Sequence, residues 1–383
     1  MTDANSATFA RLEDSAWSPA RLGAVTLRNR LVMAPMVTLF PEEADRPTAR
    51  HVEFYAARAR GGAGLVIVGA TYVSPDGKGF PNQMGIDEDS KILSFCDLAR
   101  RIQRHAPAIL QLFHAGPKTR RSITGREVVA PSESGVQDAR YDTARPLTSN
   151  EVDGLLTTYE AAASRAQSAG FRGIEVHGAN GYLIHAFSDT KSNRRTDDWR
   201  ALDALPTELV RRLRSRFPAD FLVGYTLSPF SIDGDDVADS DSLRAFVELA
   251  GKLAAAGVDY IHVYRGKAEP RDSHRHCVFA ERLREAGVTL PIVEGTDIRS
   301  SVQAEDFLRR GATLAALGRA LLGRPDLLAE PGREVPETEL ATLSTSEGLR
   351  RAFRHIAGLE KSEPKVTTDH GAPAGQRRDG PCG

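Results

Sequence analysis

The sequence predicts an α/β fold, a single (β/α)8 or TIM barrel with a C-terminal extension. Eight short apolar runs alternate with longer segments of helical periodicity along most of the 383 residues. Most of these runs are continuously apolar, as expected of parallel strands that are covered on both faces. Eight strand–helix units in succession favour a closed barrel, and such barrels use roughly 200 to 400 residues as one domain. We therefore expect residues 1–335 to form the barrel and residues 336–383 to form a last helix and a disordered tail.

The expected strands are bounded by glycine, proline or polar residues. They cover residues 31–35, 64–70, 108–113, 173–177, 221–227, 258–264, 290–295 and 313–318. An open doubly wound sheet is the alternative for this pattern, but a nucleotide-binding sheet of that kind has a glycine-rich turn after its first strand. The corresponding segment, "APMVTLFPEEADRPT", contains no glycine, and this favours the barrel.

Three of the segments between strands carry helix start or stop signals. Thr148 with Glu151, and Ser300 with Gln303, have the spacing of a capping box. Gly257 follows four apolar residues that share one helix face, and a glycine is a common helix end. These four residues are Leu243, Phe246, Val247 and Ala250.

Composition and charge argue against several classes of function. The formal net charge of -1 gives no general attraction to nucleic acid or to an anionic membrane. No apolar run reaches membrane-spanning length, and the N-terminus lacks the apolar core of a signal peptide. Cys96, Cys277 and Cys382 lie far apart, which fits reduced thiols in a cytoplasm. We expect a cytoplasmic protein that acts on small molecules; the oligomeric state, including a homo-oligomer, stays open.

Polar side chains follow the carboxyl ends of several expected strands, where the active site of a TIM barrel lies. The stretch "GIEVHGANGYLIH" ends a strand in His177 and continues with Asn180, Tyr182 and His185. A single histidine or tyrosine at such a place is more often structural than catalytic. Several of them at one rim favour a catalytic site. Further polar residues at strand ends are Gln111, His114, Tyr264, Arg265, Glu294, Thr296, Asp297 and Arg319.

A second cluster, "DSHRHC" (272–277), contains two histidines and a cysteine. These residues alternate with an arginine and lack a second pair of ligands at a spacing typical of metal sites. We interpret the segment as the solvated start of a helix and expect no metal there.

Five segments resemble the old yellow enzyme family of flavin-dependent reductases. They are "LRNRLVMAPM" (27–36), "GGAGLVIVGATYVSPDGKGFPNQMGI" (61–86), "QLFHAG" (111–116), "EVHGANGYLIHAFSDTKSNRRTDDW" (175–199) and "LGRALLGRPDLL" (317–328). They stand in the family's order and spacing across nearly the whole expected barrel. The resemblance implies FMN bound across the barrel mouth, with NADPH or NADH as the source of hydride.

The resemblance also implies which residues surround the flavin ring. Pro35 and Met36 match the backbone that passes the ring, and Ala70 matches the small residue beside it. Gln111 matches the side chain that binds the pyrimidine edge. Val37 stands where relatives have threonine or cysteine near the C4 carbonyl.

Gly318 and Arg319 match the pair on the phosphate side, where N–H groups and a cation suit a dianion. Two departures from the family lie close to the flavin. Thr226 stands where the family has an arginine against flavin N1 and O2, and Arg265 and Lys118 are candidates to supply the missing charge. In addition, Thr296 and Asp297 replace the usual glycine pair, so Asp297 must turn away from the phosphate or cap the following helix. A family Gly-Gly-Ser segment after "RTDDW" is missing as well.

On the substrate side, His177 and Asn180 match the pair that holds a carbonyl or nitro oxygen over the flavin, and Tyr182 matches the proton donor. An activated alkene accepts hydride at its β-carbon while negative charge builds on the conjugated oxygen, which two N–H donors stabilise. Tyr182 then protonates the α-carbon. The substrate-binding residues expected beside them are Leu39, Phe113 and Tyr264, with Leu39 in place of a tyrosine found in one branch.

These residues leave three functions open. The first is an FMN-dependent reductase of activated C=C bonds. The second is an FMN enzyme of the same fold that carries out a dedicated dehydrogenation, isomerisation or cyclisation. The third is a flavin-free barrel that uses His177, Asn180 and Tyr182 for acid–base chemistry or for ligand binding.

Overall fold

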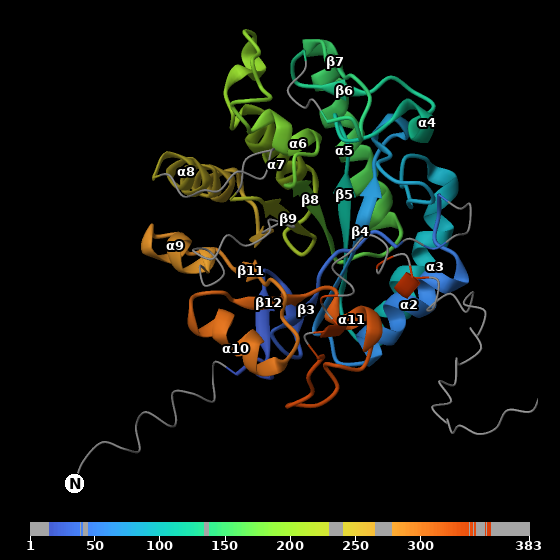
Figure 1. Cartoon of the computed structure of the whole chain (residues 1–383), viewed down its shortest axis with the longest axis vertical. Helices are drawn as coiled ribbons and strands as arrows, with labels where there is room; N and C mark the ends of the chain where they lie inside the picture. The colour runs from blue at the N-terminus through green and yellow to red at the C-terminus, as the bar shows by residue number, and fades with distance from the viewer. Residues whose placement is uncertain are drawn as a thin grey trace, which may run out of the picture.

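The computed structural model describes residues 15–38, 40, 45–133, 138–229, 240–264, 278–336 and, beyond them, 338–339, 341, 349 and 351–353. In these ranges, eight parallel strands close into a barrel with helices around its outside, which confirms the predicted fold class (Figure 1). In order around the barrel they are β3 (Leu31–Met33), β4 (Leu65–Tyr72), β5 (Ala108–Phe113), β8 (Gly173–Gly178), β9 (Leu222–Leu227), β10 (Tyr260–Val263), β11 (Ile292–Glu294) and β12 (Leu314–Leu317).

The longer helices follow the strands and cover the outer face of the barrel. They are α2 (Ala49–Arg60), α3 (Ile92–Ile102), α5 (Ser149–Ser168), α7 (Ala204–Arg216), α8 (Ser240–Ala256), α9 (Phe279–Glu285) and α10 (Ser301–Arg309). Short helices lie on connections at the mouth: α4 (Arg121–Thr124), α6 (Leu183–Phe187) and α11 (Ala320–Gly323). Single 3-10 turns span Pro75–Gly77, Asp89–Lys91 and Asp198–Arg200. In the part of the chain that the structure describes, no helix is both long and apolar enough to cross a membrane.

Each of the eight predicted strands is present, with both ends within two residues of the predicted bounds. The residues of all eight are buried, because helices cover one face of each strand and the barrel interior covers the other. The continuous apolar pattern in the sequence therefore reflects two-sided burial.

The helix signals are confirmed with one exception. The Thr148 hydroxyl accepts the N–H of Glu151 at 3.2 Å, and Glu151 accepts the N–H of Thr148 at 2.8 Å, which completes that capping box. Helix α8 ends before Gly257, whose φ is +98°, and it buries Phe246 and Ala250. The second box is only half formed, and the prediction is wrong in that respect.

At the start of α10, Ser300 accepts the N–H of Gln303 at 3.4 Å. The Gln303 side chain, however, accepts the N–H of Arg299 at 2.9 Å, one residue before the predicted partner. Arg299 also accepts the N–H of Val335 through its carbonyl, so the chain before the helix is held by this returning segment as well.

An antiparallel hairpin that the sequence did not predict closes the amino end of the barrel. Its strands are β1 (Ala20–Leu22) and β2 (Val25–Leu27), joined through Gly23 at a φ of +53°. Leu22 and Leu27 are fully buried in one apolar cluster with the first residues of four barrel strands. These first residues are Leu65, Leu222, Tyr260 and Leu314. With this end filled, the carboxyl end is left as the mouth.

A second unpredicted pair, β6 (Val129–Ala130) and β7 (Arg145–Pro146), lies on the long connection between β5 and α5. Toward the C-terminus, Phe353 packs with its ring centroid 5.5 Å from Phe40 and 5.8 Å from Phe54 of α2. Residues 354–383, which include most of the predicted tail, lie outside the described residues. The division of the chain at residue 335 stays a prediction.

Candidate active site

The residues predicted to surround a flavin lie next to one another at the barrel mouth. Ala34 donates its N–H to Leu317 at 2.9 Å, which sets the end of β3 beside the end of β12. A Cβ atom added to Gly318 would meet only Met36, with its sulfur at 3.7 Å. The Tyr55 hydroxyl lies 3.3 Å from the carbonyl oxygen of Met36 and 3.5 Å from that of the residue before Ala70. This side of the mouth is therefore open above small residues and exposed backbone.

The opposite side of the mouth is formed by β8, β9 and β10. Thr226 pairs in register with His177 on one neighbouring strand and with His262 on the other. The ring of Tyr264 lies 6.2 Å from that of His177. Burial raises the pKa of Tyr264, and the charge of Arg319 opposes part of this effect. Arg319, which follows β12, is thus close enough to Tyr264 to interact with it, and the mouth closes back toward β12. Leu39 and Arg265 lie outside the described residues, as does the cluster at 272–277.

Three rings form the substrate side of the site. The ring centroid of Phe113 lies 4.5 Å from that of Tyr182 and 5.6 Å from that of His177, and the last two are 5.2 Å apart. Ala70 belongs to the same apolar cluster, and Val37 packs against it. The hydroxyl and imidazole are thus held in apolar surroundings, where an unsatisfied polar atom is costly.

His177 is 8% exposed, and its Nδ1 is buried without a hydrogen-bond partner among the described residues. Burial lowers the pKa of His177 to about 3, although the negative charge of Glu175 acts in the opposite direction. The imidazole is therefore neutral at physiological pH. A buried nitrogen without a partner is costly, and at the barrel mouth it is available to a ligand atom.

The backbone after β8 turns sharply and fixes the other two side chains. Asn180 and Gly181 both have positive φ angles, 58° and 71°. His185 Nδ1 accepts the N–H of Gly181 at 2.7 Å, and Lys118 Nζ donates to the carbonyl of Asn180 at 2.8 Å. The Asn180 side chain in turn hydrogen-bonds the Tyr182 phenol. Lys118 thus holds the loop that carries the predicted substrate-binding residues.

Tyr182 is 9% exposed, and burial raises the pKa of its phenol. The hydroxyl is thus protonated at neutral pH. It can therefore donate a proton, provided that the proton is replaced afterwards from solvent.

Below the predicted flavin edge, a buried carboxylate collects four hydrogen-bond donors. Glu175 has no exposed surface. Its Oε1 accepts from Gln111 Nε2 at 2.8 Å and from Thr226 Oγ1 at 2.7 Å. Its Oε2 accepts from the Tyr260 hydroxyl at 2.8 Å, and His262 Nδ1 lies 3.2 Å from the same oxygen. We call these five residues the Glu175 cluster.

The Glu175 cluster stabilises a charge in the barrel interior. Burial alone would raise the pKa of Glu175, but the charge of His262 and the hydrogen bonds from its neighbours outweigh burial and lower the pKa. Gln111 also donates to Thr226 at 3.1 Å, so both of its amide protons are used within the cluster. The free polar atom of Gln111 is its carbonyl oxygen, which lies 3.4 Å from the Cβ position at Gly69.

On the predicted phosphate side, Arg319 is ion-paired with Asp297. Asp297 has a φ of 49° and is half exposed. It therefore neither turns away from this side of the mouth nor caps α10, which begins after Ser300. Burial lowers the pKa of Arg319. A phosphate here would compete with a carboxylate for the same guanidinium.

Comparisons with known proteins agree with this site. Residues 16–336 match the NADH:flavin oxidoreductase / NADH oxidase family. The chain is 33% identical over 356 residues to the NADPH dehydrogenase of Bacillus pumilus (strain SAFR-032), covering 90% of this chain and 99% of that protein. It is also 33% identical over 328 residues to the NADH oxidase of Thermoanaerobacter brockii, covering 81% of this chain and 49% of that protein. The chain thus spans about half the length of this second relative.

Among solved structures, the old yellow enzyme homologue from Zymomonas mobilis superposes with a TM-score of 0.75 at 28% identity, covering 88% of this chain and 98% of that chain. The fold is that of a flavin oxidoreductase barrel. The chain belongs to the NADH:flavin oxidoreductase / NADH oxidase family. The predicted resemblance, oxidoreductase class, FMN cofactor and nicotinamide hydride donor are confirmed at the level of the family.

The residues around the mouth fit FMN on the side of its ring. Gly318 and Ala70 leave the space that a planar ring system requires. The carbonyl oxygen of Gln111 is free to accept an N–H from the pyrimidine edge. On the phosphate side, Arg319 can bind a phosphate only after it leaves Asp297. The matches to the family on the ring side include Ala70, Gln111 and Gly318, whereas Thr226 on the ring side and Asp297 on the phosphate side depart from it.

Sequence reasoning did not single out Glu175, Tyr260 and His262 as a cluster. A signal was present, because a carboxylate inside the apolar run "GIEVH" is unusual for a buried strand. The meaning of that signal depends on β9 and β10 lying beside β8, which only the closed barrel specifies.

Proposed function

We propose that this chain reduces activated C=C bonds, taking hydride from NADPH or NADH by way of FMN and delivering it to an α,β-unsaturated carbonyl compound or a nitroalkene. The observation that supports this most strongly is the buried, partnerless Nδ1 of neutral His177 beside Asn180 and Tyr182. In the tautomer that carries its proton on Nδ1, this nitrogen can donate a hydrogen bond to a substrate oxygen.

The family relationship supports the same proposal. The NADPH dehydrogenase of Bacillus pumilus and the old yellow enzyme homologue from Zymomonas mobilis both align along nearly their whole length. FMN held at the barrel mouth would supply the hydride chemistry that links the nicotinamide to the β-carbon of the alkene. The remaining steps depend on side chains of this chain.

His177 and Asn180 hold the substrate oxygen. Negative charge develops on that oxygen as hydride adds to the β-carbon, and N–H donors aimed at it stabilise the charge most in a dry site. A neutral imidazole suits this role because it donates a hydrogen bond without giving up its proton to the product. The apolar rings of Phe113 and Tyr182 exclude water from the site.

Tyr182 supplies the proton. Its phenol transfers H⁺ to the α-carbon, so that the alkene gains one hydride and one proton and the nicotinamide loses one hydride. The hydrogen bond with Asn180 fixes the orientation of the phenol and partly offsets the effect of burial on its pKa. Solvent then returns a proton to the tyrosinate.

Tyr182→Phe tests this assignment by removing only a hydroxyl group. Stopped-flow absorbance measures the two half-reactions separately. We expect flavin reduction by NADPH to be nearly unchanged and reoxidation by a cyclic enone to slow by about 10²-fold, the usual effect of a positioned acid. A nitroalkene should be affected less, because its nitronate can be released and protonated in solvent.

The matched control is Tyr159→Phe, which removes an equally buried hydroxyl from α5, away from the mouth. It should leave both half-reactions unchanged. Equal slowing of both half-reactions by Tyr182→Phe would remove Tyr182 from the role of proton donor. A purified protein that stays colourless after addition of FMN would refute the proposed function as a whole.

A further inference from the structure

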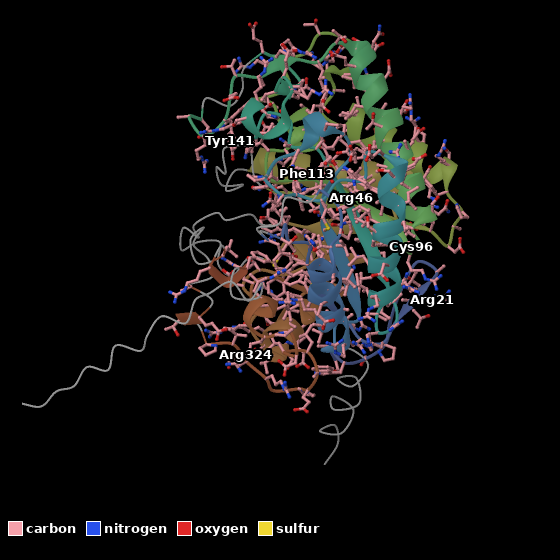
Figure 2. All side chains as sticks on the ribbon, turned by 90° about the vertical axis from the view of Figure 1, so that its right-hand side faces the viewer. Arg21, Arg46, Cys96, Phe113, Tyr141 and Arg324 are labelled. Atoms are coloured by element: carbon pink, nitrogen blue, oxygen red, sulfur yellow. The ribbon has the colours of Figure 1, made fainter. Side chains whose placement is uncertain are left out.

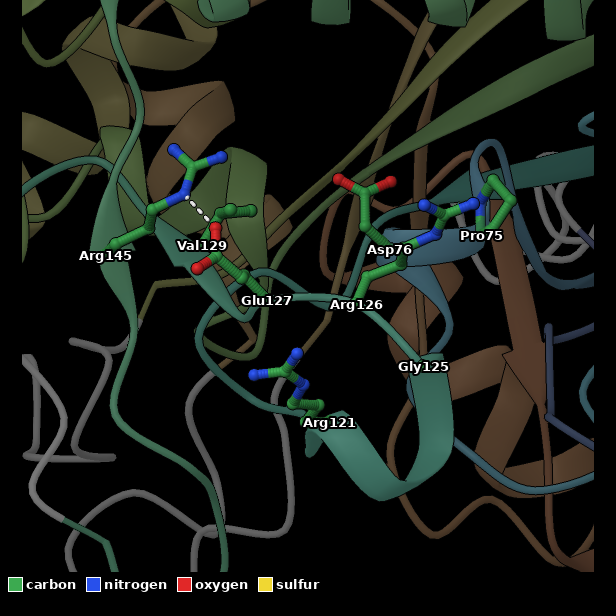
Figure 3. A pocket seen from close by; sticks show the side chains of 8 residues that line it. All are labelled: Pro75, Asp76, Arg121, Gly125, Arg126, Glu127, Val129 and Arg145. Atoms are coloured by element: carbon green, nitrogen blue, oxygen red, sulfur yellow. Dashed lines mark hydrogen bonds and ion pairs between the residues drawn. The ribbon is translucent and has the colours of Figure 1, made fainter.

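A pocket of about 520 Å³ lies beside the site, between the turn after β4 and the connection that carries α4, β6 and β7 (Figure 3). In this view Arg145 and Glu127 lie on the left, Asp76 and Arg126 on the right, and Arg121 below them. Three arginines and two carboxylates thus line one pocket. Nothing described so far assigns a ligand to it.

Arg145 and both carboxylates of the pocket already have partners among the described residues. Arg145 donates to Glu127 at 2.8 Å and to Glu151 at 2.7 Å, so it belongs to the capping region of α5. Asp76 lies 3.4 Å from Nε2 of the buried His114. Each carboxylate that lines the pocket therefore already has a cationic or hydrogen-bonding partner.

The other two arginines differ from Arg145. Arg121 and Arg126 are both exposed, and among the described residues neither guanidinium group has a carboxylate or carbonyl partner. The backbone N–H of Arg121 is bound to Asp142 at 2.7 Å, which fixes the start of α4 while leaving the side chain free. A guanidinium group has five N–H donors in a planar fork that matches two oxygens of a phosphate.

The pocket is connected to the substrate side of the mouth by short contacts. His114, which binds Asp76 of the pocket, follows Phe113 of the ring cluster in sequence. Lys118, three residues before Arg121, donates to the carbonyl of Asn180 at 2.8 Å. The residues that line the pocket and those beside His177 and Tyr182 are therefore joined by direct contacts.

We propose that Arg121 and Arg126 form a phosphate-binding subsite for the tail of a reactant whose other end lies at the flavin. Two reactants of this chemistry fit the proposed function, on which this inference rests: a nicotinamide dinucleotide and an α,β-unsaturated thioester of coenzyme A. Both carry a pyrophosphate some distance from the reacting carbon. The phosphate of FMN itself does not fit, because its expected partners follow β12, which β3 and β4 separate from β5.

The test compares Arg121→Ala/Arg126→Ala with the intact protein loaded with FMN. The matched control is Arg104→Ala/Arg172→Ala, which removes two exposed arginines at the amino end of the barrel. In one arm, flavin reduction is followed with NADPH, with NADH and with a phosphate-free N-benzyl dihydronicotinamide. In the other, flavin reoxidation is followed with an enoyl-CoA and with a cyclic enone that carries no phosphate.

We expect at least one phosphate-bearing reactant to bind about tenfold more weakly to the pocket variant, the effect of a charge-assisted hydrogen bond after screening at an exposed site. The phosphate-free reactants should be unaffected. Weakening of the nicotinamides identifies the donor as the ligand, and weakening of the enoyl-CoA identifies the substrate. Inorganic pyrophosphate should compete with the same reactant and not with its phosphate-free counterpart.

Unchanged binding of both phosphate-bearing reactants, or equal weakening in the control variant, would overturn the subsite. The proposed function fails by a different outcome, in which no donor reduces the flavin of the intact protein. In that case, calorimetric titration of inorganic pyrophosphate into the intact protein and into the pocket variant tests the phosphate-binding subsite. Equal affinity of the two proteins for pyrophosphate would exclude the subsite.

Discussion

Glu175→Gln removes one charge from the floor of the mouth while it keeps the volume of the side chain. In the intact protein the carboxylate accepts from Gln111, Thr226, Tyr260 and His262 at distances between 2.7 and 3.3 Å. A glutamine has one oxygen and one NH₂ group. In either orientation of the glutamine amide, the NH₂ group points at a hydrogen-bond donor of the cluster. At least one hydrogen bond is therefore lost, and two donors are placed against each other.

The expected cost follows from the burial of the cluster. A hydrogen bond to a charged group contributes about 1.5–3 kcal/mol, and removal of one partner from a buried ion pair costs about 3–5 kcal/mol. Glutamine keeps one acceptor, so we expect the free energy of unfolding to fall by about 2–4 kcal/mol at pH 7. That is a large share of the roughly 5–15 kcal/mol typical of a folded domain.

The dependence on pH has a defined sign. The pKa of Glu175 is lowered in the folded protein from the ordinary value of 4.5, so the unfolded state binds more protons as the pH falls below that value. The stability contributed by the carboxylate is complete above about pH 4.5 and is lost as the pH falls through the folded pKa. The difference between Glu175→Gln and the intact protein should therefore be constant from pH 8 to pH 5 and shrink in stronger acid.

Urea unfolding followed by far-UV circular dichroism, at saturating FMN and again after removal of the flavin, measures this difference. Glu281→Gln is the control, because Glu281 is partly exposed and its 2.9 Å ion pair with Arg310 should contribute less than about 1 kcal/mol. Equal stability of Glu175→Gln and the intact protein at pH 7, with unchanged m values, would refute the account of the cluster as a stabilised charge.

Two further predictions concern the flavin and the substrate oxygen. Thr226→Arg places a cation beside Glu175 and should raise the midpoint potential of FMN. The rise should be at most about 90 mV in a two-electron couple, since the Coulomb energy at ~4 Å is about 4 kcal/mol. A redox titration that shows no shift of the potential in the folded, FMN-loaded variant would contradict this prediction. Replacing both His177 and Asn180 by alanine should abolish the long-wavelength charge-transfer band that a bound phenolate gives with flavin, and an undiminished band at unchanged affinity would remove the pair from oxygen binding.

The barrel could be predicted from sequence because two-sided burial leaves a strong local signal. Each of the eight strands is a continuous apolar run, so its position can be identified without knowledge of its neighbours. The small hairpin Ala20–Leu27 gave no such signal, since each of its strands has three residues and Leu22 and Leu27 gain their burial from the barrel floor. Its existence depends on tertiary packing that no short window of sequence contains.

The same distinction between local signals and tertiary packing applies to the candidate site. His177, Asn180 and Tyr182 lie within six residues of one another after one strand, and this place together with the family resemblance led us to predict that they act together. The partners of Glu175 come from three other strands, and Asp297 meets Arg319 across the gap between β11 and β12. Neither arrangement could be predicted, because register and strand order decide which distant side chains meet.

The loss of the arginine at position 226 and the composition of the Glu175 cluster are connected. An arginine there would have satisfied Glu175 with its own guanidinium group and extended toward the flavin. Thr226 is too short to do so, and its hydroxyl instead donates downward to Glu175 at 2.7 Å. Gln111 then has to give both amide protons to the cluster, at 2.8 and 3.1 Å, and only its carbonyl oxygen faces upward. FMN bound as the resemblance implies would meet an acceptor above a carboxylate at this edge, where the resemblance leads us to expect a cation. A site of this kind stabilises added negative charge on the pyrimidine less, and it favours a flavin that gives up its hydride readily and accepts one slowly.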